Sequence, residues 1–112
     1  MPQLMGNTLQ RACASKYEEV RRAQECVGEA LAAVLPYKDR FPNKEAIYEM
    51  FPKAMEDARA TSGPGCQAML DAADYHAKAI ATWTKWEIAE EALRFKKAAL
   101  DTALNTLVTA IS

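Results

Sequence analysis

The single histidine, His76, is the first side chain whose chemistry could matter, because an imidazole titrates near neutral pH and binds metal ions. It falls on the apolar stripe of a helical segment. The nearest carboxylates, Asp71 and Asp74, are five and two residues away, so a helix points them to other sides. No second histidine and no Glu-x-x-His pattern completes a metal-ligand set. The sequence therefore predicts a structural or interface histidine, with no metal and no cofactor.

Three cysteines, Cys13, Cys26 and Cys66, form an odd set without a Cys-x-x-Cys pair. This pattern favours free thiols and a cytoplasmic or other reducing compartment. Cys13 and Cys26 lie about 20 Å apart along one helix, too far to bridge. Cys66 begins a helical segment, where the helix dipole favours a thiolate. It is the possible reactive thiol, although a small residue near a turn is the simpler interpretation.

The acidic side chains do not form an acid/base pair. Most alternate with Lys and Arg at helical spacing, which is typical of a solvated helix face. Glu90 and Lys97 differ because they interrupt an apolar repeat, where polar residues commonly fix register or partner choice. The glycine-rich stretch 63–65 has neither the lysine nor the preceding strand of a phosphate-binding loop. We therefore expect no enzymatic activity and no small-molecule substrate.

The elements that position these residues are helices. Alanine contributes 22 of the 112 residues and β-branched residues do not cluster, both of which favour helix. Helix caps are expected at Asn7 or Thr8 and at Asn43, and Pro36 and Pro52 are expected to end or kink a helix. The expected order is a flexible N-terminus over 1–7, a helix over 8–35, a loop over 36–43, a kinked helix over 44–60, a loop over 61–65 and a long helix over 66–111.

The last segment, 66–111, contains no Gly or Pro. At about 1.5 Å per residue it forms a helix about 70 Å long. This length nearly equals the summed length of the two earlier helices. The sequence therefore predicts a long antiparallel hairpin in a single domain, 1–112. Its apolar positions recur every seven residues, as in a coiled coil. The two interleaved sets are Ala72, Ala79, Trp86, Leu93, Leu100 and Leu107, and Met69, His76, Trp83, Glu90, Lys97, Leu104 and Ile111.

A two-helix hairpin has little interior, so it cannot cover a wide apolar face. Small residues widen that face beside the leucines: Ala89, Ala92, Ala99, Ala103 and Ala110. We expect the hairpin to be completed by oligomerisation into a bundle, most economically a four-helix dimer, or by docking in a larger assembly. The candidate interface residues are Trp83, Trp86, Glu90, Leu93, Lys97, Leu100, Leu104, Leu107 and Ile111. The two tryptophans fit an interface hot spot or a core equally well.

Segment 82–97 also carries two tryptophans three residues apart, then an alanine, a leucine and a pair of lysines: Trp83, Trp86, Ala89, Leu93, Lys96 and Lys97. This run resembles part of the second helix of the BAR domain of sorting nexins. The resemblance implies a dimeric helical scaffold that binds curved membranes. The chain departs from it in charge, because membrane-binding surfaces of this kind are basic and this sequence carries a net charge of −1.

Charge and composition narrow the function class. Lys and Arg number 14 against 15 Asp and Glu, which argues against a nucleic-acid-binding protein. The hydrophobic content of 50% is enough for a folded core, which argues against disorder. The leading hypothesis is a non-enzymatic helical interaction module, a structural or adaptor subunit that binds itself or another protein. The alternatives are the BAR-like scaffold and a small viral or secreted protein that inhibits a host machine by binding.

Overall fold

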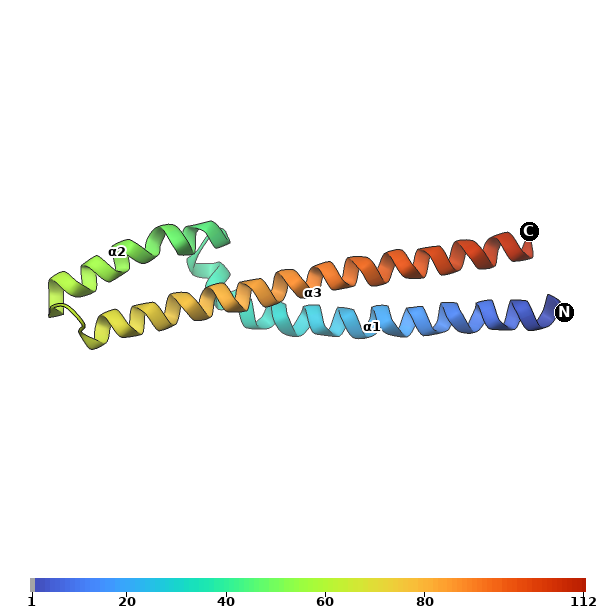
Figure 1. Ribbon diagram of the computed structural model, residues 1–112, viewed down its shortest axis with the longest axis horizontal. Coiled ribbons are helices and arrows are strands. Elements are labelled where there is room, and N and C mark those ends of the chain that lie inside the picture. The colour runs from blue at the N-terminus through green and yellow to red at the C-terminus, as the bar shows by residue number, and fades with distance from the viewer. Residues whose placement is uncertain (1) are drawn as a thin grey trace. The chain divides into compact units, whose positions relative to one another are not determined.

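The computed structural model describes residues 2–112, and their side chains from residue 7 onward. Three helices make up the chain (Figure 1): α1 (Pro2–Arg40), α2 (Lys44–Ser62) and α3 (Gln67–Ile111). No strand occurs in this part of the chain. The predicted all-α helical hairpin is therefore confirmed. Because α1 begins at Pro2, the backbone of residues 2–7, expected to form a flexible tail, belongs to this helix; Met1 lies outside the described residues.

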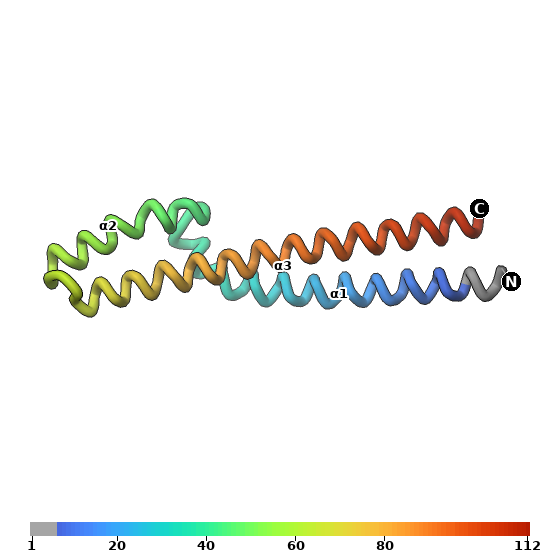
Figure 2. The backbone as a smooth tube through the Cα atoms, in the orientation of Figure 1, coloured from blue at the N-terminus to red at the C-terminus, as the bar shows by residue number. Residues whose placement is uncertain are grey.

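The contacts of the chain fall into two packing units. The hairpin unit comprises residues 1–29 and 87–112, and the three-helix unit comprises residues 30–86. In the hairpin unit, the first part of α1 runs antiparallel to the last part of α3, as the backbone trace shows (Figure 2). In the three-helix unit, α2 lies beside the first part of α3, and the last turns of α1 pack with both.

The three-helix unit holds the main core. Val34 and Ile47 are fully buried, from α1 and α2, and Ala79 and Trp83 of α3 close the core from the third side. Phe41, directly after α1, is 3% exposed and packs in the same cluster. Three helices enclose a common interior here, which is why this unit buries large side chains.

The hairpin unit buries much less. Val20, 6% exposed, is the one buried apolar side chain among those described in this unit. Cys13 and Val27, one heptad before and after Val20, are half-buried, so the seven-residue pattern predicted for α1 does face α3. Each helix has only one neighbour here, and much of its surface stays exposed.

α1 does not end at Leu35 as predicted; it continues through Pro36 to Arg40. Proline removes one helical hydrogen bond and crowds the preceding turn, which costs about 3 kcal/mol or more. Pro36 lies on the exposed side, where water can hydrate the freed carbonyl of Ala32. The opposite side carries Val34 and Tyr37 into the core. Burial of that side offsets the proline penalty, so the predicted loop 36–43 shrinks to residues 41–43.

α2 likewise passes through its proline without a break in helical structure. Pro52 is exposed, and so is Tyr48, whose carbonyl has lost its helical donor. The predicted cap is confirmed, since the Asn43 side chain accepts a hydrogen bond from the Ala46 backbone N–H at 2.8 Å. The helix ends at Ser62, two residues later than expected. Gly63 follows with φ of 91°, a conformation that favours glycine.

The apolar stripe of α3 changes position where its neighbours change. In the three-helix unit the second heptad set is buried or half-buried, as predicted: Met69, His76 and Trp83. In the hairpin unit the next two members of that set, Glu90 and Lys97, are exposed. The residues just before them, Ala89 and Lys96, are half-buried instead. An α-helix has 3.6 residues per turn, so a stripe drifts against a strict seven-residue repeat. Glu90 and Lys97 therefore lie on the exposed side of α3, and their role in register or partner choice stays a prediction.

Candidate functional site

The two tryptophans lie in the three-helix unit. Trp83 is 7% exposed and belongs to the core cluster, and Trp86 packs against that cluster with its ring perpendicular to that of Trp83. The Lys38 ammonium nitrogen lies 3.8 Å from the Trp86 ring centroid, a cation–π contact. The indole N–H of Trp86 is buried with no acceptor among the described residues. Trp83 is therefore a core residue within this chain.

His76 is also a core residue. Its side chain is 8% exposed, and its Nδ1 lies 2.7 Å from the Ala72 carbonyl oxygen, one helical turn earlier. Phe41, Phe51 and Tyr75 surround the imidazole, with ring centroids between 5.4 and 5.8 Å away. The expected structural role fits this environment.

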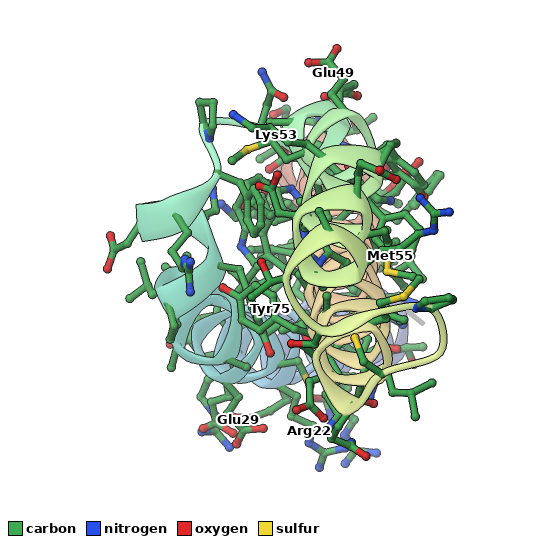
Figure 3. The ribbon with its side chains drawn as sticks, turned by 90° about the vertical axis from the view of Figure 1, so that its left-hand side faces the viewer. Arg22, Glu29, Glu49, Lys53, Met55 and Tyr75 are labelled. Atoms are coloured by element: carbon green, nitrogen blue, oxygen red, sulfur yellow. The ribbon has the colours of Figure 1, made fainter. Side chains whose placement is uncertain are left out.

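A cavity of about 360 Å³ opens beside His76 in the three-helix unit. Figure 3 shows Tyr75 directed into the space between the end of α1 and the α2–α3 pair, with Lys53 at the upper edge. The Arg40 guanidinium stacks 5.1 Å from the Tyr75 ring centroid. Arg40 and Lys53 bring positive charge to the cavity lining. Asp57, which also lines the cavity, partly offsets that charge. We find no catalytic arrangement in this lining.

Cys66 occupies the N-cap position of α3. Its carbonyl accepts hydrogen bonds from the backbone N–H groups of Met69 and Leu70, and its thiol lies 3.5 Å from the Ala58 carbonyl oxygen of α2. Donation to a carbonyl requires the protonated thiol. This contact ties α3 to α2, and it supports the simpler interpretation of Cys66. The cysteines Cys13, Cys26 and Cys66 are all free.

A groove of about 350 Å³ lies between α1 and α3 in the hairpin unit. Its apolar lining comes from small side chains of both helices: Ala23, Cys26, Ala89 and Ala92. Charged side chains frame it: Glu19, Arg22 and Lys96. Small residues on both walls keep the groove open, so a side chain from outside can enter it.

Glu19 and Lys96 join the two helices beside the groove. The Lys96 ammonium lies 3.1 Å from one Glu19 carboxylate oxygen, and the Lys16 ammonium lies 3.3 Å from the other. The hydrogen bond from Lys96, followed by that from Lys16, lowers the pKa of Glu19 below its ordinary value of 4.5. This bridge fixes the polar edge of the groove and leaves its alanine walls uncovered.

Two large apolar side chains of α3 stand next to the groove. Ile88 is 64% exposed and Phe95 is 69% exposed. Ala92 lies four residues after Ile88 and three before Phe95, so the three share one face of the helix. We call the groove lining together with Ile88 and Phe95 the groove face. It combines exposed bulky side chains with a depression, the two parts of a docking surface.

The remaining predicted interface residues separate into two sets. Leu93, Leu100 and Leu107 are half-buried on the side of α3 that faces α1. Leu104 and Ile111 are exposed, together with Val108. At 3.6 residues per turn, Leu104 lies about 160° around the helix from Ile88. These C-terminal residues therefore form a separate strip that does not extend the groove face.

Sequence reasoning identified the small residues of the groove face, Ala89 and Ala92, but not the bulky ones. Ile88 and Phe95 fall outside the leucine heptad. They are seven residues apart. Ala92 follows Ile88 by four residues, and Ala99 follows Phe95 by four residues. This second heptad was the signal that could have found them.

No group of three or more metal-binding side chains occurs within the described part of the chain. None of the described helices has a stretch that combines the length and hydropathy of a membrane span. No family model matches the chain, and neither curated proteins nor solved structures show a significant similarity to it.

Proposed function

We propose that this protein is a helical protein–protein interaction module that works through the groove face of its hairpin unit. One observation carries the proposal: Ile88 and Phe95 remain more than 60% exposed beside an alanine-lined groove. Burying a side chain of this size contributes about 1.5–3 kcal/mol. A partner that covers both would gain up to about 3–6 kcal/mol from these two side chains, which favours a contact on this face.

The proposal is tested by replacing the two exposed apolar side chains with charged ones. We expect a variant with Ile88→Glu and Phe95→Glu to lose the proteins that the tagged wild-type chain captures from its source. It should also bind less of the hydrophobic dye ANS, while its thermal unfolding midpoint stays unchanged because both residues are exposed. Tyr17→Glu is the matched control, since Tyr17 is 57% exposed in the same unit and does not line the groove. Equal capture and equal dye binding by the double variant would refute the proposal.

The BAR-like alternative predicts a different result. The basic residues that would contact lipid are Lys85, Arg94, Lys96 and Lys97. Lys96 is bound to Glu19, and Glu91 lies 3.9 Å from Arg94. These carboxylates weaken the attraction to anionic lipid. Under this alternative, the chain should co-sediment with anionic vesicles at low salt. It should lose that binding at high salt, because salt screens electrostatic attraction.

A further inference from the structure

We propose that the cavity beside His76 binds a small aromatic anion, a planar ring that carries a carboxylate or a phosphate group. The cavity lies wholly within the three-helix unit and shares no residue with the groove face. The inference therefore goes beyond the proposed function, and either one can fail without the other. It adds a small ligand, which the sequence alone did not predict.

All three helices of the unit contribute to the cavity lining. The residues from α2 are Met50, Lys53, Ala54 and Asp57. Their spacing of three and four residues places them on one side of that helix. Arg40 and Phe41 line the cavity at the end of α1, and Tyr75 and His76 line it from α3. The volume of about 360 Å³ lies near the lower end of the range of about 300–1,000 Å³ for ligand pockets, so it suits a small ligand.

Three rings in the lining offer contacts to a planar ligand. The ring centroid of Tyr75 lies 6.3 Å from that of Phe41 and 5.5 Å from that of His76, and the centroids of Phe41 and His76 are 5.8 Å apart. Phe41 and His76 are buried in the three-helix unit, so packing holds their rings in place before a ligand arrives. Such preorganisation lowers the entropy cost of binding.

Two cations in the lining determine the sign of the ligand charge. The Arg40 guanidinium already lies over the Tyr75 ring, and Lys53 lies at the edge of the same cavity (Figure 3). Both side chains are exposed, and among the described residues neither has a carboxylate within 4 Å. A cationic ligand would be repelled, whereas an anion would accept charge-assisted hydrogen bonds from both side chains.

Asp57 opposes the binding of an anion. Its carboxylate lines the cavity four residues after Lys53, and like charges repel each other. Removal of this one negative charge should therefore tighten the binding of an anion. Damage to the fold would weaken binding instead, so this change of affinity separates the proposed site from a general structural effect.

The test is a titration with phenyl phosphate followed by NMR at constant pH. His76 is the only histidine in the chain, so its imidazole C–H signals are identified without further assignment. The ring current of a bound phenyl group should shift these signals. We expect a saturable shift with a Kd below about 1 mM. Inorganic phosphate lacks the ring and benzyl alcohol lacks the charge, so each should bind at least about tenfold more weakly.

Single substitutions connect the binding to these side chains. Arg40→Gln and Lys53→Gln should each raise the Kd for phenyl phosphate at least about fivefold, because each removes a hydrogen bond to a charged group. Asp57→Asn should lower the Kd about threefold. Arg59→Gln and Lys78→Gln are the matched controls, since both residues are exposed cations of the same unit and neither lines the cavity. Each control should leave the Kd within about twofold of the wild-type value, because salt screens distant charges.

Any of four results would overturn the inference. The first is the lack of a saturable His76 shift up to about 10 mM phenyl phosphate. The second is equal affinity for inorganic phosphate or for benzyl alcohol. The third is an unchanged Kd in either Arg40→Gln or Lys53→Gln, and the fourth is an Asp57→Asn variant that does not bind more tightly.

Two measurements keep these results separate from other effects. Circular dichroism and the thermal unfolding midpoint should stay unchanged in every variant, because the substituted side chains are exposed. The variant with Ile88→Glu and Phe95→Glu should bind phenyl phosphate as the wild-type chain does, since neither residue lines the cavity. Failure of the cavity and failure of the groove face are therefore distinguishable.

Discussion

Substitution of Trp83 by alanine distinguishes a core tryptophan from an interface tryptophan. Trp83 is 93% removed from solvent and packs with Val34, Ile47 and Ala79. A buried aromatic side chain hides about 150–250 Å², which at about 25 cal/mol per Å² is worth about 4–6 kcal/mol. Measured Trp→Ala changes in cores cost about 3–5 kcal/mol. We therefore expect the three-helix unit to lose about 4 kcal/mol of unfolding free energy.

The assay is urea unfolding followed by two signals. Both tryptophans, Trp83 and Trp86, lie in the three-helix unit, so the fluorescence of the remaining Trp86 reports on that unit. Far-ultraviolet circular dichroism reports on all helices. We expect the fluorescence midpoint to fall sharply in Trp83→Ala, and the dichroism transition to broaden if the hairpin unit unfolds separately.

Phe95→Ala is the matched control because it removes an aromatic ring that is 69% exposed. Its cost should stay below about 1 kcal/mol. If Trp83→Ala costs no more than Phe95→Ala, the core assignment of Trp83 is wrong. If Trp83→Ala also weakens partner binding at a temperature where the chain stays folded, then the tryptophan contributes to an interface after all.

Two further predictions concern single contacts. Asn43→Ala removes the acceptor of the Ala46 N–H at the start of α2, so it should cost about 1 kcal/mol in urea unfolding, whereas Asn43→Asp should cost much less. Because the pKa of Glu19 is lowered in the folded chain, its stabilising effect is complete above pH 4.5 and disappears as the pH falls through the folded pKa. Glu19→Gln should therefore flatten the fall of the unfolding midpoint below that pH, and an unchanged profile would exclude this contribution.

Helix content was predictable because it depends on local properties. The abundance of alanine, the absence of Gly and Pro over 66–111 and the cap at Asn43 all act within a few residues. These features also bounded the second and third helices to within two residues. The antiparallel hairpin followed from comparing helix lengths.

The effect of Pro36 was not predictable from local rules. Proline disfavours a helix wherever it stands, so the sequence predicts an end at Leu35. Whether the helix tolerates it depends on which side faces water and what the other side buries. Only the packing of Val34 and Tyr37 in the three-helix unit supplies that information.

The direction of each α3 side chain was likewise decided by tertiary packing. A heptad pattern indicates which residues share one side of a helix. It does not indicate how far that side rotates around the helix along its length, or which neighbouring helix it contacts. Trp83 turns inward because two other helices enclose it, whereas Glu90 turns outward where α1 is the only neighbour. The sequence by itself determined that the chain is helical and paired antiparallel. The tertiary structure decided which apolar residues are covered, since burial depends on the number of neighbours a helix has at each point along its length.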